Sequence, residues 1–287
     1  MSNTVLSSFN PHIRDENIQF FEKEHKYEIL DHDAKYTSVT SWVHTHFPKF
    51  NPDMIIKSMM NGKKWLPGHK YWGKTAEEIK KEWCSNDAAN AGTNLHYQIE
   101  CFINNKSLHL PYTHKDLLDA YITTKTKTTI TTNIECEQAP EWNYFIQFIK
   151  DYPQLKPYRT EWVVYDEDVQ IAGSIDMVYE NEDGTLSIYD WKRSKEISST
   201  NNYKKFAYTD CIKHIPHTNF WHYALQLNIY KKILENKYNK KIKELFLVRL
   251  HPNNTEQTYN LIKLPLLEDE MTNLFEARQQ TIKTISL

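Results

Sequence analysis

Hydrophobic residues recur at helical spacing between residue 51 and about residue 106. The clearest case is NAGTNLHYQIECFIN, in which Leu95, Ile99 and Phe102 fall near one stripe. Because residues three and four apart share a helix face, this segment is predicted to be an amphipathic helix. Before this region, HKYEILDHDAKYTSVTSWV predicts a short hairpin, with DHD as its turn, that runs into a helix.

The second half of the chain has the apolar alternation that predicts β-strands. RTEWVVYDED, VQIAGSIDMVYE and TLSIYDWKR each give one strand, and NEDG gives the turn between the last two. Helices are expected at about 141–151 and 219–237, on either side of this block. ELFLVRLHP and TYNLIKLPL predict two further strands, and a helix that begins near Leu267 closes the chain. The Thr-rich stretch at 123–133 predicts an exposed loop or edge strand, because β-branched residues disfavour helix.

This order of elements predicts the fold class. A helix, three antiparallel strands, a helix and a further strand are typical of an α/β or α+β core, in which helices flank a mixed central β-sheet. We expect an N-terminal hairpin and helical region over residues 1–90 and the core over residues 91–287, with the two forming one compact unit.

The amino-acid composition indicates a globular protein and limits the kinds of partner that it can bind. With 40% hydrophobic and 25% charged residues, the 287-residue chain has the balance of a globular protein. Its formal net charge of −2 excludes a global basic field, so a site for a polyanion must be a local patch. No apolar run is long enough to cross a bilayer, and the first residues lack a secretory hydrophobic segment, so we expect an intracellular protein without a membrane partner.

Some common binding motifs are missing from the sequence. The four cysteines form no CxxC pair, so a zinc ribbon is not indicated. Neither GxxxxGK[ST] nor GxGxxG occurs, so a glycine-rich phosphate loop is not indicated either.

Polar residues interrupt the predicted apolar faces in a definite order. His96 precedes Glu100 by one helical turn, Asp176 lies in GSIDMV, and Asp190 and Lys192 end the next strand. Two carboxylates from adjacent strands form an oxygen site suited to Mg²⁺ or Mn²⁺, and an imidazole shifts the preference toward Mn²⁺. Such a metal polarises a phosphoryl oxygen, and a neighbouring lysine offsets the developing negative charge. This division of roles fits phosphodiester hydrolysis.

Each of these residues also has an ordinary structural explanation. Asp190 and Lys192 alone could form a surface ion pair, which contributes little to stability. His96 alone could be a hydrogen-bonded helix histidine. Asp176 is harder to explain in this way, because burying an unpaired acid in an apolar run is costly. Gln226 is similarly polar within an apolar helix face, so the order of the set carries more weight than any member.

In this order, the motifs GTxLHxxIE, GSIDMV, DWK and QLxxY resemble those of the PD-(D/E)XK nucleases of the RecB-like branch. That branch includes the RecB nuclease domain, CRISPR-associated exonucleases and the mitochondrial genome maintenance exonuclease. The resemblance runs from about Gly92 to Tyr230, and HTNFWHYALQLNIYKKILE also resembles members from large DNA viruses and phages. It implies a restriction-endonuclease-like core and a metal-dependent nuclease.

The resemblance also implies roles for individual residues. His96, Asp176 and Asp190 would ligate Mg²⁺ or Mn²⁺, together with the backbone carbonyl of Trp191. Lys192 would be the catalytic lysine. The third motif carries aspartate before the lysine, which the family pattern permits.

One further acid and two polar side chains complete the site that the resemblance implies. Glu161 would be a supporting acid near the metal waters, and Gln226 and Tyr230 would steady the lysine or contact the nucleic-acid backbone. Helix geometry adds Glu100, for which a solvated surface position is an equal alternative. Relatives with an iron–sulfur cluster place three cysteines after QLxxY, whereas every cysteine here precedes Gln226, so no cluster is expected.

Nucleic acid is the partner that these motifs imply, and its phosphates require local cations. Lysines and aromatic residues alternate after the catalytic strand, a composition that suits a single strand, although a solvated connector explains it equally well. Residues 61–83 are also basic and aromatic, and the corresponding helices of relatives help to form an arch over the strand. The expected nucleic-acid contacts in the first segment are Arg193, Lys195, Tyr203, Lys204 and Lys205.

The sequence therefore predicts a metal-dependent deoxyribonuclease, an exonuclease that acts on ends or on single-stranded DNA. An RNA endonuclease with the same core is one alternative, and a catalytically idle DNA-binding protein is another. The presence of Asp176, Asp190 and Lys192 together argues against the idle protein, which would not need them.

Overall fold

Six strands form the central sheet of the computed structural model, which describes residues 4–285 apart from 22, 25, 31, 84–86, 128–138 and 202–203. The strand order is β3-β5-β6-β7-β8, with β4 paired to the other edge of β5. β4, β5 and β6 are successively antiparallel, whereas β6 and β7 are parallel, so the sheet is mixed as predicted. The strands are β3 (Thr37–Ser38), β4 (Lys156–Asp166), β5 (Ile171–Glu180), β6 (Leu186–Lys192), β7 (Ile242–Arg249) and β8 (Asn260–Lys263).

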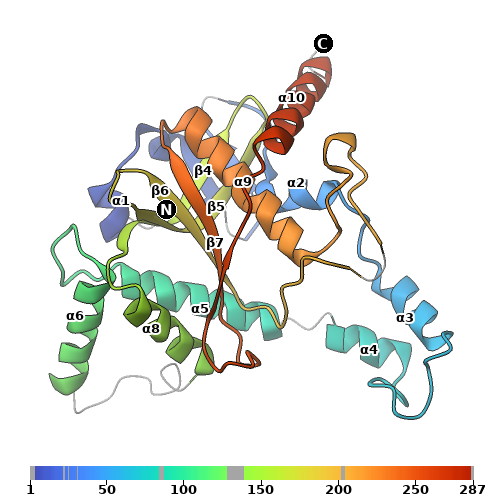
Figure 1. The fold of residues 1–287 in the computed structure, drawn as a ribbon. Helices are drawn as coiled ribbons and strands as arrows, with labels where there is room; N and C mark the ends of the chain where they lie inside the picture. Colours follow the sequence, from blue (N-terminus) through green and yellow to red (C-terminus); the bar gives the residue numbers. More distant parts are fainter. Residues whose placement is uncertain are drawn as a thin grey trace.

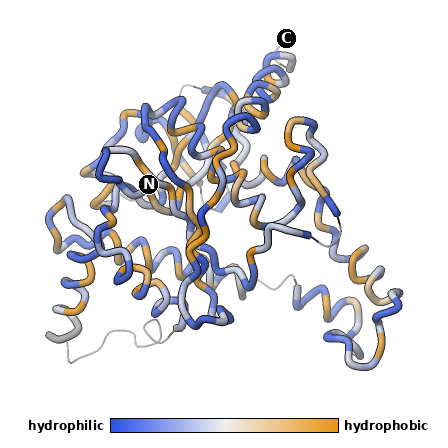
Figure 2. Tube along the Cα trace, in the orientation of Figure 1, coloured by the Kyte–Doolittle hydropathy of each residue, from blue (hydrophilic) through white to orange (hydrophobic). Residues whose placement is uncertain are grey.

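Helices cover both faces of this sheet (Figure 1). Helices α5 and α8 share a hydrophobic cluster with one face, and α2, α9 and α10 share another cluster with the opposite face. Side chains alternate along β5, so that Met177 and Tyr179 enter the first cluster and Val178 enters the second. Figure 2 shows the hydrophobic residues concentrated along the central strands. The helices are α1 (Val5–Phe9), α2 (Val39–Thr45), α3 (Pro52–Met60), α4 (Ala76–Trp83), α5 (Asp87–Ile103), α6 (His114–Lys127), α8 (Pro140–Asp151), α9 (Asn219–Lys237) and α10 (Glu268–Ile285), with short 3-10 helices η1 (Ile13–Asn17) and η2 (Asp210–Ile212).

The N-terminal hairpin differs from the prediction. Strand β2 (Lys26–Ile29) pairs with the preceding strand β1 (Ile18–Phe21), so DHD is not the hairpin turn. The segment after DHD instead joins the main sheet, where β3 runs parallel to β5. This pairing joins residues more than 130 positions apart, and local sequence patterns do not report contacts of that range. The proposed boundary near residue 90 stays a prediction, although α2 already packs in the same cluster as α9.

The Thr-rich stretch also begins differently from the prediction. Residues 123–127 continue α6 rather than forming a loop or edge strand, and residues 128–133 lie outside the described residues. The hydroxyl of Thr123 donates to the carbonyl of Asp119 at 2.7 Å, and that of Thr124 donates to the carbonyl of Ala120 at 2.9 Å. Hydrogen bonds to the preceding turn therefore accommodate these residues in the helix.

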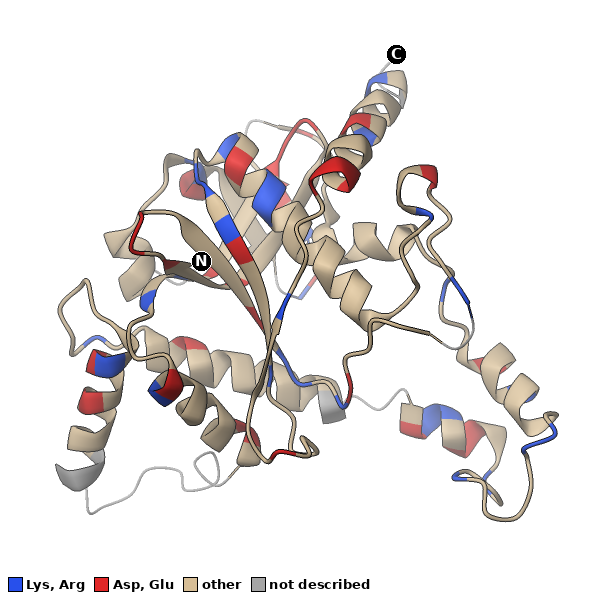
Figure 3. Cartoon of the chain, in the orientation of Figure 1, with Lys and Arg blue, Asp and Glu red and all other residues tan. Residues whose placement is uncertain are grey.

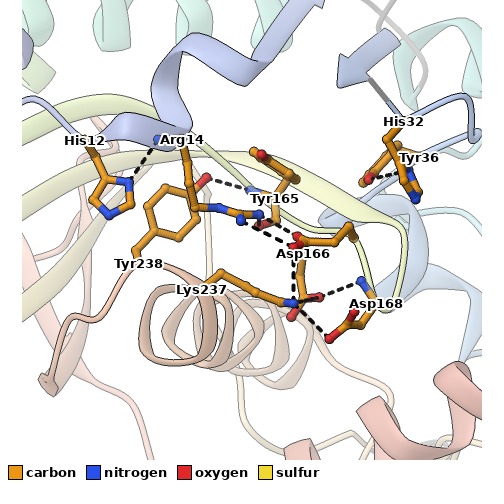
Figure 4. A network of polar contacts seen from close by, with 10 residues as sticks. His12, Arg14, His32, Tyr36, Tyr165, Asp166, Asp168, Lys237 and Tyr238 are labelled. Atoms are coloured by element: carbon orange, nitrogen blue, oxygen red, sulfur yellow. Dashed lines mark hydrogen bonds and ion pairs between the residues drawn. The ribbon is translucent and has the colours of Figure 1, made fainter. Parts of the chain in front are cut away.

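A network of charged and aromatic residues anchors the N-terminal segment to the β4–β5 hairpin (Figure 4). Arg14 Nη2 lies 2.5 Å from Glu167 Oε2, and its guanidinium lies 4.0 Å from the centre of the Tyr165 ring. Lys237, at the end of α9, lies 2.8 Å from Asp168 Oδ2 in the hairpin turn. Helix α9 and the N-terminal segment thus hold the same hairpin, whose two strands carry candidate site residues.

The sheet opens next to these residues. Strand β6 pairs with β5 only from Met177 to Glu180, and β3 pairs with it at Ile171 and Ala172. Because β4 occupies the other edge of β5 throughout, β3 and β6 share one edge and leave residues 173–176 between them. The end of this gap is the position of Asp176.

Candidate active site

A histidine and two carboxylates meet beside the opening in the sheet. His96 comes from α5, Glu161 from β4 and Asp176 from β5, and one ligand atom of each lies within 4.8 Å of the others. His96 Nδ1 is 3.6 Å from Asp176 Oδ2 and 4.0 Å from Glu161 Oε1. Three elements that are distant in sequence therefore bring nitrogen and oxygen ligands to one point.

The β4–β5 pairing explains why the two acids are adjacent. Thr160 pairs with Met177 and Trp162 with Ile175, so the register places Glu161 opposite Asp176. Glu161 has a φ of 42°, a strained conformation for a residue other than glycine, and such strain is concentrated at functional sites. Ser174 Oγ donates to Glu161 Oε2 at 3.0 Å and fixes the side chain.

The backbone of Trp191 connects β6 to both the histidine and the aspartate. Its amide donates to Asp176 Oδ2 at 3.0 Å, and His96 Nε2 lies 2.9 Å from its carbonyl oxygen. When Nε2 donates to this carbonyl, the lone pair of Nδ1 faces the two carboxylates. Metal-ligating histidines are commonly oriented in this way, by a hydrogen bond from the other ring nitrogen.

Asp190 and Lys192 form an ion pair on the opposite face of β6 from the Trp191 ring. Lys192 Nζ lies 2.5 Å from Asp190 Oδ2, and Asp190 is only 3% exposed. Burial and then repulsion from Asp176 raise the pKa of Asp190, although Lys192 opposes this. Burial disfavours the ammonium, but the carboxylates of Asp190 and Asp176 outweigh it and raise the pKa of Lys192. The ammonium form of Lys192 is therefore favoured.

Comparison with known proteins identifies the family. A family model described as the PD-(D/E)XK nuclease superfamily matches residues 70–286, about three quarters of the chain. The chain belongs to the PD-(D/E)XK nuclease superfamily. A solved structure named "Putative exonuclease" from Eubacterium rectale is similar at 13% identity, with a TM-score of 0.32, and the match covers 78% of this chain and 86% of that chain. No curated protein matches the sequence.

Membership of the PD-(D/E)XK superfamily confirms the expected family at that level and, with the observed sheet, the restriction-endonuclease-like mixed fold. The match begins before α5 and includes every candidate site residue named from the sequence. In the described part of the chain, no helix is long and apolar enough to span a membrane.

Only some of the expected metal ligands lie together in the cluster. Glu161, expected as a supporting acid, belongs to the cluster with His96 and Asp176. Asp190 lies just beyond the last pair of the β5–β6 register, Met177 with Tyr189, and outside that cluster, and its Oδ2 faces Lys192. The Trp191 carbonyl faces His96. The metal roles of Asp190 and of this carbonyl stay predictions.

The acids of the site are crowded enough to favour a cation. Burial and then repulsion from Asp176 raise the pKa of Glu161 to about 8, although its side chain keeps 35% exposure, so solvent weakens the effect of burial. Asp190 Oδ2 is buried, and its charged neighbour is the Lys192 ammonium 2.5 Å away. A divalent ion would relieve the repulsion among the acids, so the donor set fits Mg²⁺ or Mn²⁺.

Glu100 faces the site rather than bulk solvent alone. It is half-buried, burial raises its pKa, and it lines a cavity of about 640 Å³ together with His96 and Glu161. The polar residues Asn90 and Asn94 on the same helix also line this cavity. The cavity therefore opens the histidine side of the cluster to solvent.

Gln226 and Tyr230 occupy the gap between β3 and β6. Tyr230 is 3% exposed and is hydrogen-bonded with Gln226. A Cβ added at Gly173 would lie 2.8 Å from the Tyr230 ring and hydroxyl, so the helix approaches the strand closely here. The buried ring has almost no surface to offer to nucleic acid, so the geometry favours the alternative role of support for the site.

The residues expected to bind nucleic acid are in different situations. Arg193 Nε donates to Glu141 Oε1 at 2.8 Å and is largely committed to that pair. Lys195, Lys204 and Lys205 are exposed. Tyr203 lies outside the described residues. The three exposed lysines are thus those available for phosphate contacts.

Two residues of the site were not recognised in the sequence. Tyr223 places its ring 4.7 Å from Lys192 Nζ, and Ser174 holds Glu161. Tyr223 lies three residues before Gln226, hence on a neighbouring part of the same helix face, and Ser174 lies two residues before Asp176 on the same side of β5. These spacings were visible, but their partners come from other elements.

Proposed function

We propose that this protein is a divalent-metal-dependent nuclease of the RecB-like branch that hydrolyses DNA phosphodiester bonds. It would act as an exonuclease on DNA ends or single strands. The observation that supports this most is the convergence of His96, Glu161 and Asp176 within 4.8 Å, with the Asp190–Lys192 pair on the adjoining strand. A binding protein would gain nothing from so many crowded acids.

His96, Asp176 and Glu161 would hold Mg²⁺ or Mn²⁺, with Asp190 and the Trp191 carbonyl as further candidates. Such an ion polarises a phosphoryl oxygen and lowers the pKa of bound water. The protonated Lys192 would place its positive charge beside the scissile phosphate and offset the charge that develops there. Trp191 and Ser174 would keep His96, Asp176 and Glu161 in place through the hydrogen bonds described above.

The hairpin of α3 and α4 would guide the strand toward the site. Residues 48–83 contain eight lysines and four acidic residues, and several of the lysines lie along the loop that joins the two helices (Figure 3). Trp65 and Trp72 lie 5.8 Å apart in this loop, and Trp72 is 46% exposed. Exposed aromatic rings among lysines are suited to unstacked bases and their phosphates. The resemblance to arch-forming relatives supports the same role.

Digestion of linear and circular single-stranded DNA tests the proposed function. With Mg²⁺ or Mn²⁺, the linear DNA should be degraded and the circle should persist, because an exonuclease requires an end. Lys192→Met should abolish cleavage, whereas Lys243→Met, which removes an exposed ion pair with Asp183, should not. Cleavage of the circle would refute the exonuclease, and equal cleavage by Lys192→Met would refute the assigned site. Parallel RNA substrates decide between DNA and RNA.

A further inference from the structure

A groove between α2 and α9 has no role in the function proposed above. Its volume is about 220 Å³, below the range of about 300–1,000 Å³ that is common for drug-sized ligands. A single flat ring system is therefore the size of ligand that it can hold. The polar residues of its wall are Thr40 and His44 from α2 and Asn219, His222, Tyr223 and Gln226 from α9.

Two residues of the wall connect this groove to the candidate active site. The Tyr223 ring lies 4.7 Å from Lys192 Nζ. Gln226 is hydrogen-bonded with Tyr230, whose ring lies against Gly173 three residues before Asp176. A ligand in the groove would therefore lie against Tyr223, whose ring contacts Lys192.

The chemistry of the wall is neutral, polar and aromatic. Among the described residues, no lysine or arginine lines the groove, so this wall lacks the cations that a phosphate site requires. Burial lowers the pKa of His222 to about 4, and this imidazole is therefore neutral near pH 7. Amide, imidazole and phenol groups can together hydrogen-bond and stack against a neutral heterocycle.

His222 is also fixed in place and has an unused nitrogen. Its ring stacks on His217 at 5.0 Å with an interplanar angle of 15°, and the centre of the Phe47 ring lies 4.2 Å away. Its Nε2 is buried and has no hydrogen-bond partner among the described residues. This nitrogen has almost no exposed surface, so the part of His222 that a ligand in the groove can meet is the rest of its ring.

We propose that the groove between α2 and α9 receives one nucleobase of the substrate, turned out of its strand next to the scissile phosphate. This subsite rests on the proposed nuclease function and adds recognition of a base to it. Enzymes hold such bases by stacking on aromatic rings and by hydrogen bonds to the base edge. The rings of His222 and Tyr223 offer the stacking surface, and the polar groups of Thr40 and His44 offer the hydrogen bonds.

Oligonucleotides that each lack one base test the subsite. The probes are single-stranded DNAs with an abasic position moved stepwise along the cleavage region. The kcat/KM of the wild-type protein should fall about tenfold at one position, which corresponds to the loss of one stacked base, and change little elsewhere. The groove variants His222→Ala and His44→Ala should cut the intact DNA more slowly but show no further loss at that abasic position.

A second groove variant and a control variant outside the groove allow the abasic-site experiment to refute the subsite. His44 is exposed, so His44→Ala provides the answer if removal of the packed His222 ring prevents folding. His109→Ala, an exposed histidine in the loop before α6, should keep the full abasic penalty. A wild-type protein that is indifferent to base loss at every position, or folded groove variants that keep the penalty, would overturn the subsite. A wild-type protein that cuts no oligonucleotide would instead contradict the nuclease function itself.

Discussion

Replacing Gly173 by alanine would test how closely α9 approaches the strand that carries Asp176. The added Cβ would lie 2.8 Å from Cε1 and from the hydroxyl oxygen of Tyr230, and 3.1 Å from Val39 Cγ2. Real Cβ atoms essentially never approach other heavy atoms to 2.8 Å, and Tyr230 is too deeply buried to move aside freely. Either the ring or the strand must shift.

The size of the effect follows from this contact. Inserting one methyl group into a filled core costs about 1–3 kcal/mol. For a protein of 287 residues, a loss of about 2 kcal/mol lowers Tm by about 3 °C. Because Ser174 and Asp176 lie on the same strand, cleavage should fall together with stability. Differential scanning calorimetry and a cleavage assay on the same samples measure both.

Two comparisons make the Gly173→Ala result specific. Gly92→Ala, inside α5 where an added Cβ meets nothing within 4 Å, should raise stability by up to about 1 kcal/mol, since alanine favours helix over glycine. In a Tyr230→Leu background, Gly173→Ala should cost less than in the wild type, because the clashing ring is gone. An unchanged Tm for Gly173→Ala would refute the close approach. An equal cost in both backgrounds would show that Tyr230 is not its cause.

Three further predictions concern the ligands, the lysine and a buried histidine. Asp176→Asn should remove Mn²⁺ binding measured by calorimetry, and unaltered affinity would count against its role as a ligand. Lys192→Met should retain DNA binding in an anisotropy assay while cleavage is lost; it also leaves Asp190 unpaired, which costs about 3–5 kcal/mol, so its folding is checked by circular dichroism. Burial lowers the pKa of His114 to about 3, so below about pH 6.5 the unfolded chain takes up a proton that the folded chain does not. Urea unfolding should therefore show a loss of about 2 kcal/mol from this residue between pH 7.5 and pH 5, which His114→Asn should remove; an equal pH slope in both proteins would contradict this.

The sequence predicted the elements of the core well because most of their signals are local. The strand from Ile171 to Glu180 and the helix around His96 each have a strong period and recognisable ends. The motif order also predicts the PD-(D/E)XK superfamily, which the match over residues 70–286 confirms, whereas the RecB-like branch stays a prediction. The mixed sheet followed from the order of helices and strands.

What the sequence did not reveal depends on contacts between distant segments. The pairing of β3 with β5 gives no local signal, so the hairpin was placed around DHD instead of between β1 and β2. The sequence also does not show how closely Glu161 approaches His96 and Asp176, because this depends on the exact register and on a strained backbone at Glu161. Tyr230 was considered for nucleic-acid contact because an apolar period does not show that its hydroxyl is buried.

The position of Trp191 has a consequence for the choice of metal ion. Its indole is 2% exposed and packs on the rings of Phe145 and Phe148, while its peptide groups contact both His96 and Asp176. The spacing of the ligands is therefore tied to the stiffness of an aromatic layer, and it can widen only if that layer yields. Calcium needs longer bonds and more ligands than magnesium. We expect this frame to hold one ligand spacing, and truncation of Phe148 to weaken the discrimination between Mg²⁺ and Ca²⁺.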